Sequence, residues 1–77
     1  MIKVGQFRCW KNKDHTWDQN AAYFHILKIY NQNVSDDEQY THFEKVCDIR
    51  LLDGRITRRW NIYNVENDSI IIEGDNA

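Results

Sequence analysis

The dipeptide Asp53-Gly54 constrains the fold of this chain more than any other feature, because it joins two stretches of alternating polar and apolar residues. Asp-Gly is typical of a two-residue type I′ β-turn, in which both central residues need a positive φ. A turn of this type predicts a β-hairpin. Its facing pairs would be Leu52 and Arg55, Leu51 and Ile56, Ile49 and Arg58, Asp48 and Arg59, and Cys47 and Trp60.

The alternation also predicts which face of this hairpin is buried, because successive side chains of a strand point to opposite faces. The residues predicted to face the core are Phe43, Cys47, Ile49, Leu51, Ile56, Trp60 and Ile62. The residues predicted to face solvent are Glu44, Asp48, Arg50, Arg55, Thr57, Arg59 and Asn61.

Two further strands are predicted at the ends of the chain. Residues 3–11 form the first, with a bend at Gly5, and the β-branched run "SIIIE" at 69–73 forms the last. The polar segment 11–20 is predicted to be a long loop, and "NVEND" at 64–68 a turn. Residues 73–77 are expected to form a flexible tail of a single domain that spans 1–77.

Two segments are compatible with either strand or helix. Residues 21–31 fit an amphipathic helix, but their content of Ile, Tyr and Phe favours a strand. Residues 35–39 are predicted to be an acidic loop that precedes a strand starting at 41. The Ser-x-x-Glu spacing that begins at Ser35 also fits a helix cap, so an α+β fold with one short helix near 36–46 is the alternative to a mainly-β fold.

Five short strands with one long loop after the first resemble a small SH3-like β-barrel. The resemblance covers residues 4–72 and depends on "VGQ" at 4–6, the central Asp-Gly hairpin, and "NIYNVENDSIII" at 61–72. It implies a small five-stranded barrel of a class that includes phage-encoded accessory proteins and nucleic-acid-binding modules. The chain has no ALYDY-like run and no Trp-Trp pair, so recognition of proline-rich ligands is not implied.

Several functions are disfavoured by composition and spacing. The 77 residues have a net charge of -2, so no overall positive field attracts nucleic acid. Cys9 and Cys47 are not spaced as zinc ligands, and the three glycines form no phosphate-binding loop. We therefore expect a protein that is not an enzyme and has no catalytic residues, metal or cofactor. Without a secretory or membrane segment, we expect it in the cytoplasm with buried, reduced cysteines.

The remaining candidates are surfaces for a macromolecular partner. The chain combines a basic hairpin at 50–60 with abundant aromatic residues, and Trp, Tyr and Arg dominate the hot spots of protein interfaces. We predict a protein-binding accessory or inhibitor protein, with self-association also allowed and no membrane contact. The alternative is a nucleic-acid-binding module that uses the hairpin arginines on phosphates. The predicted partner-binding residues are Trp17, Arg50, Arg55, Arg59 and Trp10.

Overall fold

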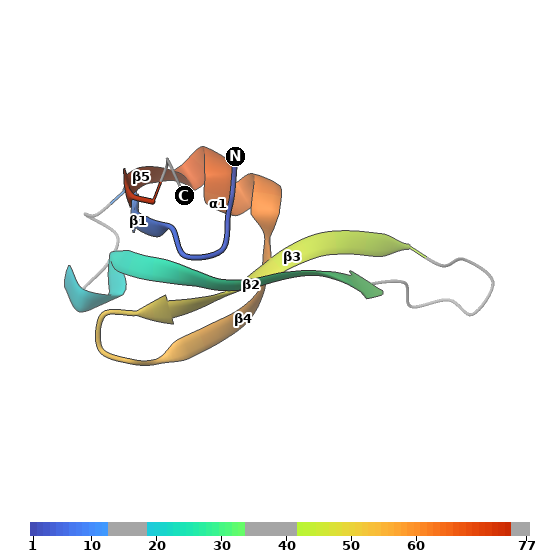
Figure 1. Ribbon diagram of the computed structural model, residues 1–77, viewed down its shortest axis with the longest axis horizontal. Helices are drawn as coiled ribbons and strands as arrows, with labels where there is room; N and C mark the ends of the chain where they lie inside the picture. Colours follow the sequence, from blue (N-terminus) through green and yellow to red (C-terminus); the bar gives the residue numbers. More distant parts are fainter. Residues whose placement is uncertain (13–18, 34–41, 75–77) are drawn as a thin grey trace.

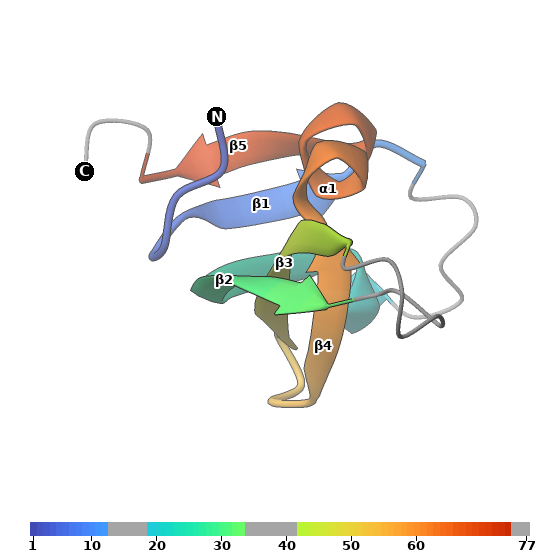
Figure 2. The same cartoon turned by 90° about the vertical axis from the view of Figure 1, so that its right-hand side faces the viewer.

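A computed structural model describes residues 1–12, 19–33 and 42–74. The elements, in chain order, are β1 (Phe7–Trp10), the 3-10 helix η2 (Gln19–Ala21), β2 (Tyr23–Asn33), β3 (Phe43–Leu51), β4 (Ile56–Asn61), α1 (Ile62–Asp68) and β5 (Ser69–Glu73). The strands form one antiparallel sheet in the order β4-β3-β2-β1-β5. The fold of the described residues is therefore mainly β, as predicted, with a short α-helix at a position where none was predicted. The sheet is open rather than closed into a barrel, with β4 and β5 at its two edges (Figures 1 and 2).

The hydrophobic core lies between the sheet and the layer made by α1 and the N-terminal segment (Figure 1). Its buried members are Ile2, Phe24, Ile26, Cys47, Ile49 and Val65. Partly buried residues that pack against it are Trp10, Ile29, Leu51 and Ile62. A chain of this size buries only about 60% of its unfolded surface, so each of these side chains is a large share of the core.

The strand prediction for residues 21–31 is confirmed by β2, but the faces of this strand change along its length. Ile26 pairs with Ile49 and Lys28 with Asp48, so Leu27 is an extra residue at a β-bulge. Beyond this bulge Ile29, rather than Lys28 or Tyr30, faces the core. Simple alternation places Tyr30 on the same face as Ile26, and the bulge moves it to the opposite, outer face.

The turn between β3 and β4 has three residues instead of the two that a type I′ turn requires. The Gly54 amide donates to the Leu51 carbonyl (2.9 Å), and the Leu51 amide donates to the Arg55 carbonyl (2.8 Å). Gly54 has the predicted positive φ of 92°, whereas Asp53 does not have a positive φ. This geometry is a type I turn followed by a left-handed glycine. The Arg55 amide donates a hydrogen bond to the Asp53 carboxylate (2.9 Å). In a two-residue turn, the same amide would donate to the opposite strand instead.

The extra turn residue shifts the pairing of the hairpin by one position. Arg50 faces Ile56, which corrects the predicted pairing of Ile56 with Leu51. Facing residues share a face of the sheet, so Ile56 lies on the outer face with Arg50 and is 49% exposed. A β-bulge at residues 58–59 then restores the register, because the predicted pair of Cys47 and Trp60 is confirmed.

The outer part of the hairpin is less buried than predicted at two further positions. Phe43 is 60% exposed because it lies where β2 and β3 continue as a two-stranded ribbon beyond α1 (Figure 1). Trp60 is 38% exposed because it belongs to the edge strand β4. The predicted burial of Cys9, Cys47 and Ile49 is confirmed.

The α-helix that the described residues form, α1, lies near the C-terminal end of the chain, and the described part of the alternative helix at 36–46 is a strand. Residues 43–46 belong to β3, while the predicted turn at 64–68 is part of α1. Asn61 caps α1, because its side-chain Oδ1 accepts hydrogen bonds from the amides of Tyr63 (2.9 Å) and Asn64 (3.2 Å). The helix buries Val65 completely. Within the described residues, no helix has the length and hydrophobicity needed to cross a bilayer.

Several predicted segments lie wholly or partly outside the described residues. They are 13–18 of the first loop, 34–41 with the predicted acidic loop, and 75–77 of the predicted tail. The last strand, predicted at 69–73, is confirmed as β5.

A buried arginine ties β1 to the C-terminal end of α1. Arg8 is 3% exposed, and its Nε donates to the hydroxyl of Ser69 (2.7 Å) while Nη2 donates to the carbonyl of Ser69 (3.1 Å). Its Nη1 donates to the side-chain carbonyl of the buried Gln6 (3.0 Å). The Ser69 hydroxyl in turn donates to the carbonyl of Val65. A positive group at a helix C-terminus also interacts favourably with the helix dipole.

Candidate functional site

The five predicted partner-binding residues do not form one cluster in the described structure. Trp17 lies outside the described residues. Trp10 is half-buried against the core, where its ring packs on Phe24 (4.5 Å between centroids) and on Trp60 (5.2 Å). The three predicted arginines are exposed on the β3–β4 hairpin, on the outer side of the sheet or at its turn.

Arg55 differs from the other hairpin arginines because its charge is already balanced. Its Nε lies 2.6 Å from Oδ2 of Asp53 within the turn. The backbone hydrogen bond from Arg55, together with its guanidinium group, lowers the pKa of the Asp53 carboxyl group below its ordinary value. Arg55 therefore stabilises the turn and offers less charge to a partner than Arg50 or Arg59.

The bulge at residues 58–59 places arginines beside a tyrosine on the outer face. Arg59 has a φ of 67°, a left-handed conformation that is uncommon for a residue with a side chain. Its amide donates to Oδ1 of Asp48 (3.3 Å), the same oxygen that accepts the hydroxyl of Tyr30 (2.7 Å). The hydrogen bond to Asp48 raises the pKa of Tyr30, and the positive charges of Arg59 and Arg58 partly oppose this rise. Both guanidinium groups are therefore close enough to influence the tyrosine hydroxyl.

The predicted facing pair of Asp48 and Arg59 would place a carboxylate opposite a guanidinium group. The hydrogen bond that joins them uses the Arg59 amide rather than its guanidinium group. Arg50, Arg58 and Arg59 form no ion pair within the described part of the chain. The three guanidinium groups are therefore not held by a carboxylate of the described residues, although the Asp48 carboxylate lies on the same face and offsets part of their charge.

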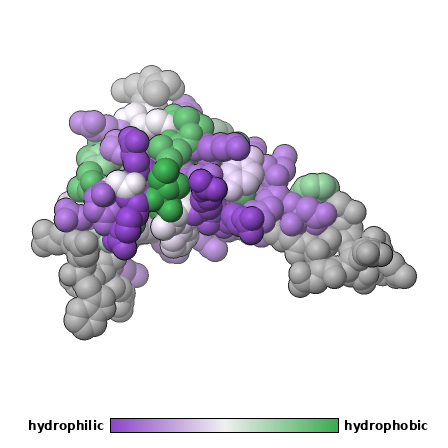
Figure 3. Space-filling view, turned by 90° about the horizontal axis from the view of Figure 1, so that it is seen from below, coloured by the Kyte–Doolittle hydropathy of each residue, from purple (hydrophilic) through white to green (hydrophobic). Residues whose placement is uncertain are grey.

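We call this surface the basic face; it consists of Lys28, Tyr30, Arg50, Arg58 and Arg59. The Lys28 ammonium lies 4.9 Å from the centre of the Tyr30 ring, a cation–π distance. At the turn end of the face the aliphatic side chains of Leu52 and Ile56 are exposed. Figure 3 views the molecule from the side of β4 and shows a strip of hydrophobic groups within a largely hydrophilic surface.

Lys28 and Tyr30 are site residues that sequence reasoning missed. The β-bulge at Leu27 brings them to the outer face, and no local sequence signal marks a bulge at this position. Arg58 was one of the hairpin arginines of the nucleic-acid alternative but was not among the five predicted partner-binding residues.

The described residues contain no group of three or more His, Cys, Asp or Glu side chains that could hold a metal ion. Both cysteines are buried and free of disulfide bonds. Burial, and secondarily the charge of Asp48, raises the pKa of the Cys47 thiol to about 11. A thiol in this state is a poor nucleophile at neutral pH.

Comparison of the chain with known protein families, curated proteins and solved structures gives no match.

Proposed function

We propose that this protein is a binding module that recognises a partner protein through the basic face. The observation that carries the proposal is a set of exposed arginines, Arg50, Arg58 and Arg59, that have no ion-pair partner among the described residues. They lie beside a tyrosine and exposed aliphatic side chains. Arginine and aromatic residues are enriched at protein interfaces and at their hot spots. The complementary partner surface would carry carboxylates next to apolar side chains.

A module of this kind acts by occupying a surface and needs no catalytic group. It would serve as an accessory protein or as a stoichiometric inhibitor, as in the phage-encoded class that the sequence resembles. The strand order supports the SH3-like part of this proposal, because β1 pairs with both β2 and β5 and so brings the first and last strands together.

In the test, the wild type and two variants are each immobilised and exposed to a lysate of the cells where the protein acts. The proteins that each one captures are then compared. The double variant Arg50→Glu/Arg58→Glu should lose a protein that the wild type and Lys11→Glu both retain. Lys11 is an exposed lysine outside the basic face, so its charge reversal is the matched control. Circular dichroism must show that all three are folded. Equal capture by the double variant and the wild type would contradict the proposal.

Nucleic acid is the second candidate, favoured by the cluster of Lys28, Arg58 and Arg59 around an aromatic ring. Backbone phosphates interact with such cations, and bases stack on aromatic rings. Fluorescence anisotropy with labelled oligonucleotides separates the candidates. If phosphates bind here, Arg58→Ala and Arg59→Ala should each reduce the slope of log affinity against log salt by about 1. Arg55→Ala, whose charge is paired with Asp53, should change it less. An absence of micromolar binding at low salt eliminates this candidate.

A further inference from the structure

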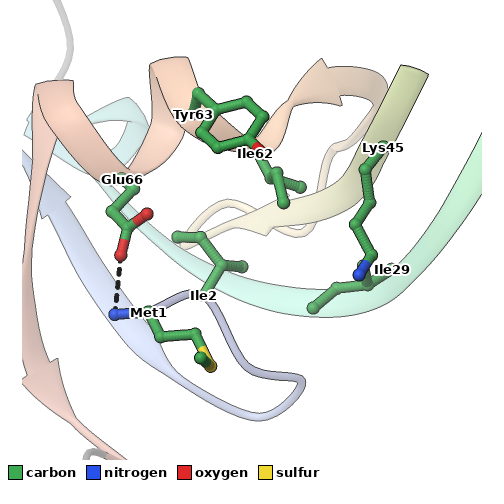
Figure 4. A pocket seen from close by; sticks show the side chains of 7 residues that line it. All are labelled: Met1, Ile2, Ile29, Lys45, Ile62, Tyr63 and Glu66. Carbon is green, nitrogen blue, oxygen red and sulfur yellow. Dashed lines mark ion pairs between the residues drawn. The ribbon is translucent and has the colours of Figure 1, made fainter.

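A hollow of about 340 Å³ lies on the face of the sheet opposite the basic face, in the corner between α1, the N-terminal segment and the β2–β3 ribbon (Figure 4). Ile2, Ile29 and Ile62 supply its apolar floor, and Tyr63 of α1 lies at one side. This volume is at the small end of ligand-binding pockets, so it fits one or two large side chains rather than a cofactor.

The walls of the hollow are unusually exposed for apolar side chains. Tyr63 is 66% and Met1 82% exposed, although both line a concave surface. Large apolar groups around a hollow, with charged groups at its rim, are a feature of interaction sites.

The rim has one acidic group that forms an ion pair and one basic group that has no ion-pair partner among the described residues. Oε1 of Glu66 lies 2.7 Å from the Met1 ammonium nitrogen, and this hydrogen bond lowers the pKa of the Glu66 carboxyl group. Lys45 is exposed and forms no ion pair among the residues that the structure describes. A ligand that complements the hollow therefore has an apolar group for its interior and a carboxylate close to that group for Lys45.

The ribbon beside the hollow offers a free strand edge. Strand β4 ends at Asn61, which faces Val46, so the backbone of residues 43–45 in β3 pairs with β2 alone in the described structure. Alternation puts Phe43 and Lys45 on the same face of β3, Lys45 lines the hollow, and Phe43 is exposed. An unpaired edge can accept an extended peptide as an additional strand.

We propose that this corner binds an extended segment of a partner protein, which places an apolar side chain in the hollow and an adjacent carboxylate beside Lys45. The free edge of residues 43–45 favours an extended segment over a compact small molecule. The site shares no residue with the basic face, so the proposal does not depend on the proposed function and fails or succeeds separately from it.

The test is a titration of ¹⁵N-labelled protein with the acetylated, amidated tetrapeptide Gly-Leu-Asp-Gly, followed by NMR. We expect saturable shifts of the Ile29, Lys45 and Tyr63 amides, with a dissociation constant on the order of 1 mM for so short a segment. The Gly-Leu-Asn-Gly peptide should bind about threefold more weakly, as expected for loss of an exposed ion pair. Lys45→Gln should remove this preference, whereas Lys11→Gln, at a site away from the hollow, should keep it.

Five results would overturn the proposal, four of them from the peptide titration and its protein-only control. The first three are an absence of saturable shifts, shifts centred on other residues, and equal binding of the two peptides by the wild type. The fourth is that the same amides shift when the concentration of the protein alone is raised. This result would assign the hollow to a second copy of this chain. Binding of 4-phenylbutyrate without binding of the peptide would also overturn it, in favour of a small-molecule carboxylate. Tyr63→Ser, at an exposed position, should weaken peptide binding without preventing folding.

Discussion

Replacement of the buried Arg8 by methionine should destabilise the protein more than most single substitutions. Methionine retains an unbranched side chain of similar reach but removes the guanidinium donors. The side-chain carbonyl of Gln6 and the main-chain carbonyl of Ser69 would each lose the hydrogen bond that Arg8 donates, at 3.0 Å and 3.1 Å respectively. Both acceptors belong to buried residues, so water does not readily replace the lost donor.

The size of the effect is estimated from those two acceptors. The Ser69 hydroxyl, which accepts from Arg8 Nε, keeps its own hydrogen bond to the Val65 carbonyl, and the Glu66 carbonyl accepts from Nη2 only at 3.5 Å. A buried acceptor left without its donor costs about 1–3 kcal/mol, so the loss at Gln6 and Ser69 amounts to about 2–6 kcal/mol. Burial of the Arg8 guanidinium is itself unfavourable, and its removal offsets part of this loss. We therefore expect Arg8→Met to lower the free energy of unfolding by about 3 kcal/mol. In a domain of this size that corresponds to a fall in Tm of about 12–24 °C.

Urea unfolding followed by tryptophan fluorescence would measure this change, with circular dichroism as a second probe. The double variant Arg8→Met/Gln6→Leu also removes the orphaned Gln6 acceptor. It loses the hydrogen bond from Gln6 Nε2 to the Met1 carbonyl (2.9 Å) as well, but Met1 is exposed and water can replace that donor. The double variant should therefore recover about 1 kcal/mol relative to Arg8→Met. A loss below 1 kcal/mol for Arg8→Met would refute the reasoning. So would a double variant less stable than Arg8→Met, because the cost would then not come from the unpaired Gln6 acceptor.

Two further predictions concern the turn and the buried thiol. Gly54→Ala should cost about 1 kcal/mol in urea unfolding, because φ is 92° but an added Cβ would meet no atom within 4 Å beyond Gly54 and its chain neighbours. Gly74→Ala should cost more, because its Cβ would lie 3.0 Å from Cα of Gln6. Equal losses would argue against the steric difference. Cys47 should resist thiol reagents in the folded state, and stability should decline as pH rises from 9.0 to about 11, since the folded state favours the protonated thiol. Fast labelling of Cys47 at neutral pH would contradict this prediction.

Local sequence patterns determined the parts of this fold that depend on neighbouring residues. The β-branched run at 69–73 predicts β5, and the aromatic and β-branched content of 21–31 predicts β2. The requirement for a positive φ at Gly54 is also a local property and was predicted correctly. The helix α1 was not predicted because a helix of seven residues is too short to show a hydrophobic repeat, although Asn61 is a recognisable cap.

The candidate site depended on features that alternation does not reveal. One extra residue in the turn and one in each of two bulges decide which side chains face outward, since a shift of one residue reverses the face of a strand. These changes bring Lys28 and Tyr30 to the outer face beside Arg58 and Arg59, and move Ile56 out of the core.

The sequence by itself therefore determined a mainly-β domain with a central hairpin, buried cysteines and an arginine-rich outer surface. Only the tertiary structure decided that Arg55 is paired with Asp53, that Asp48 binds the Arg59 amide, and that α1 closes a hollow over β2 and β3. The physical reason is the separation along the chain of the residues that interact. Turn and strand preferences arise from the backbone and nearest neighbours, whereas bulges, ion pairs and hollows arise from how distant segments pack.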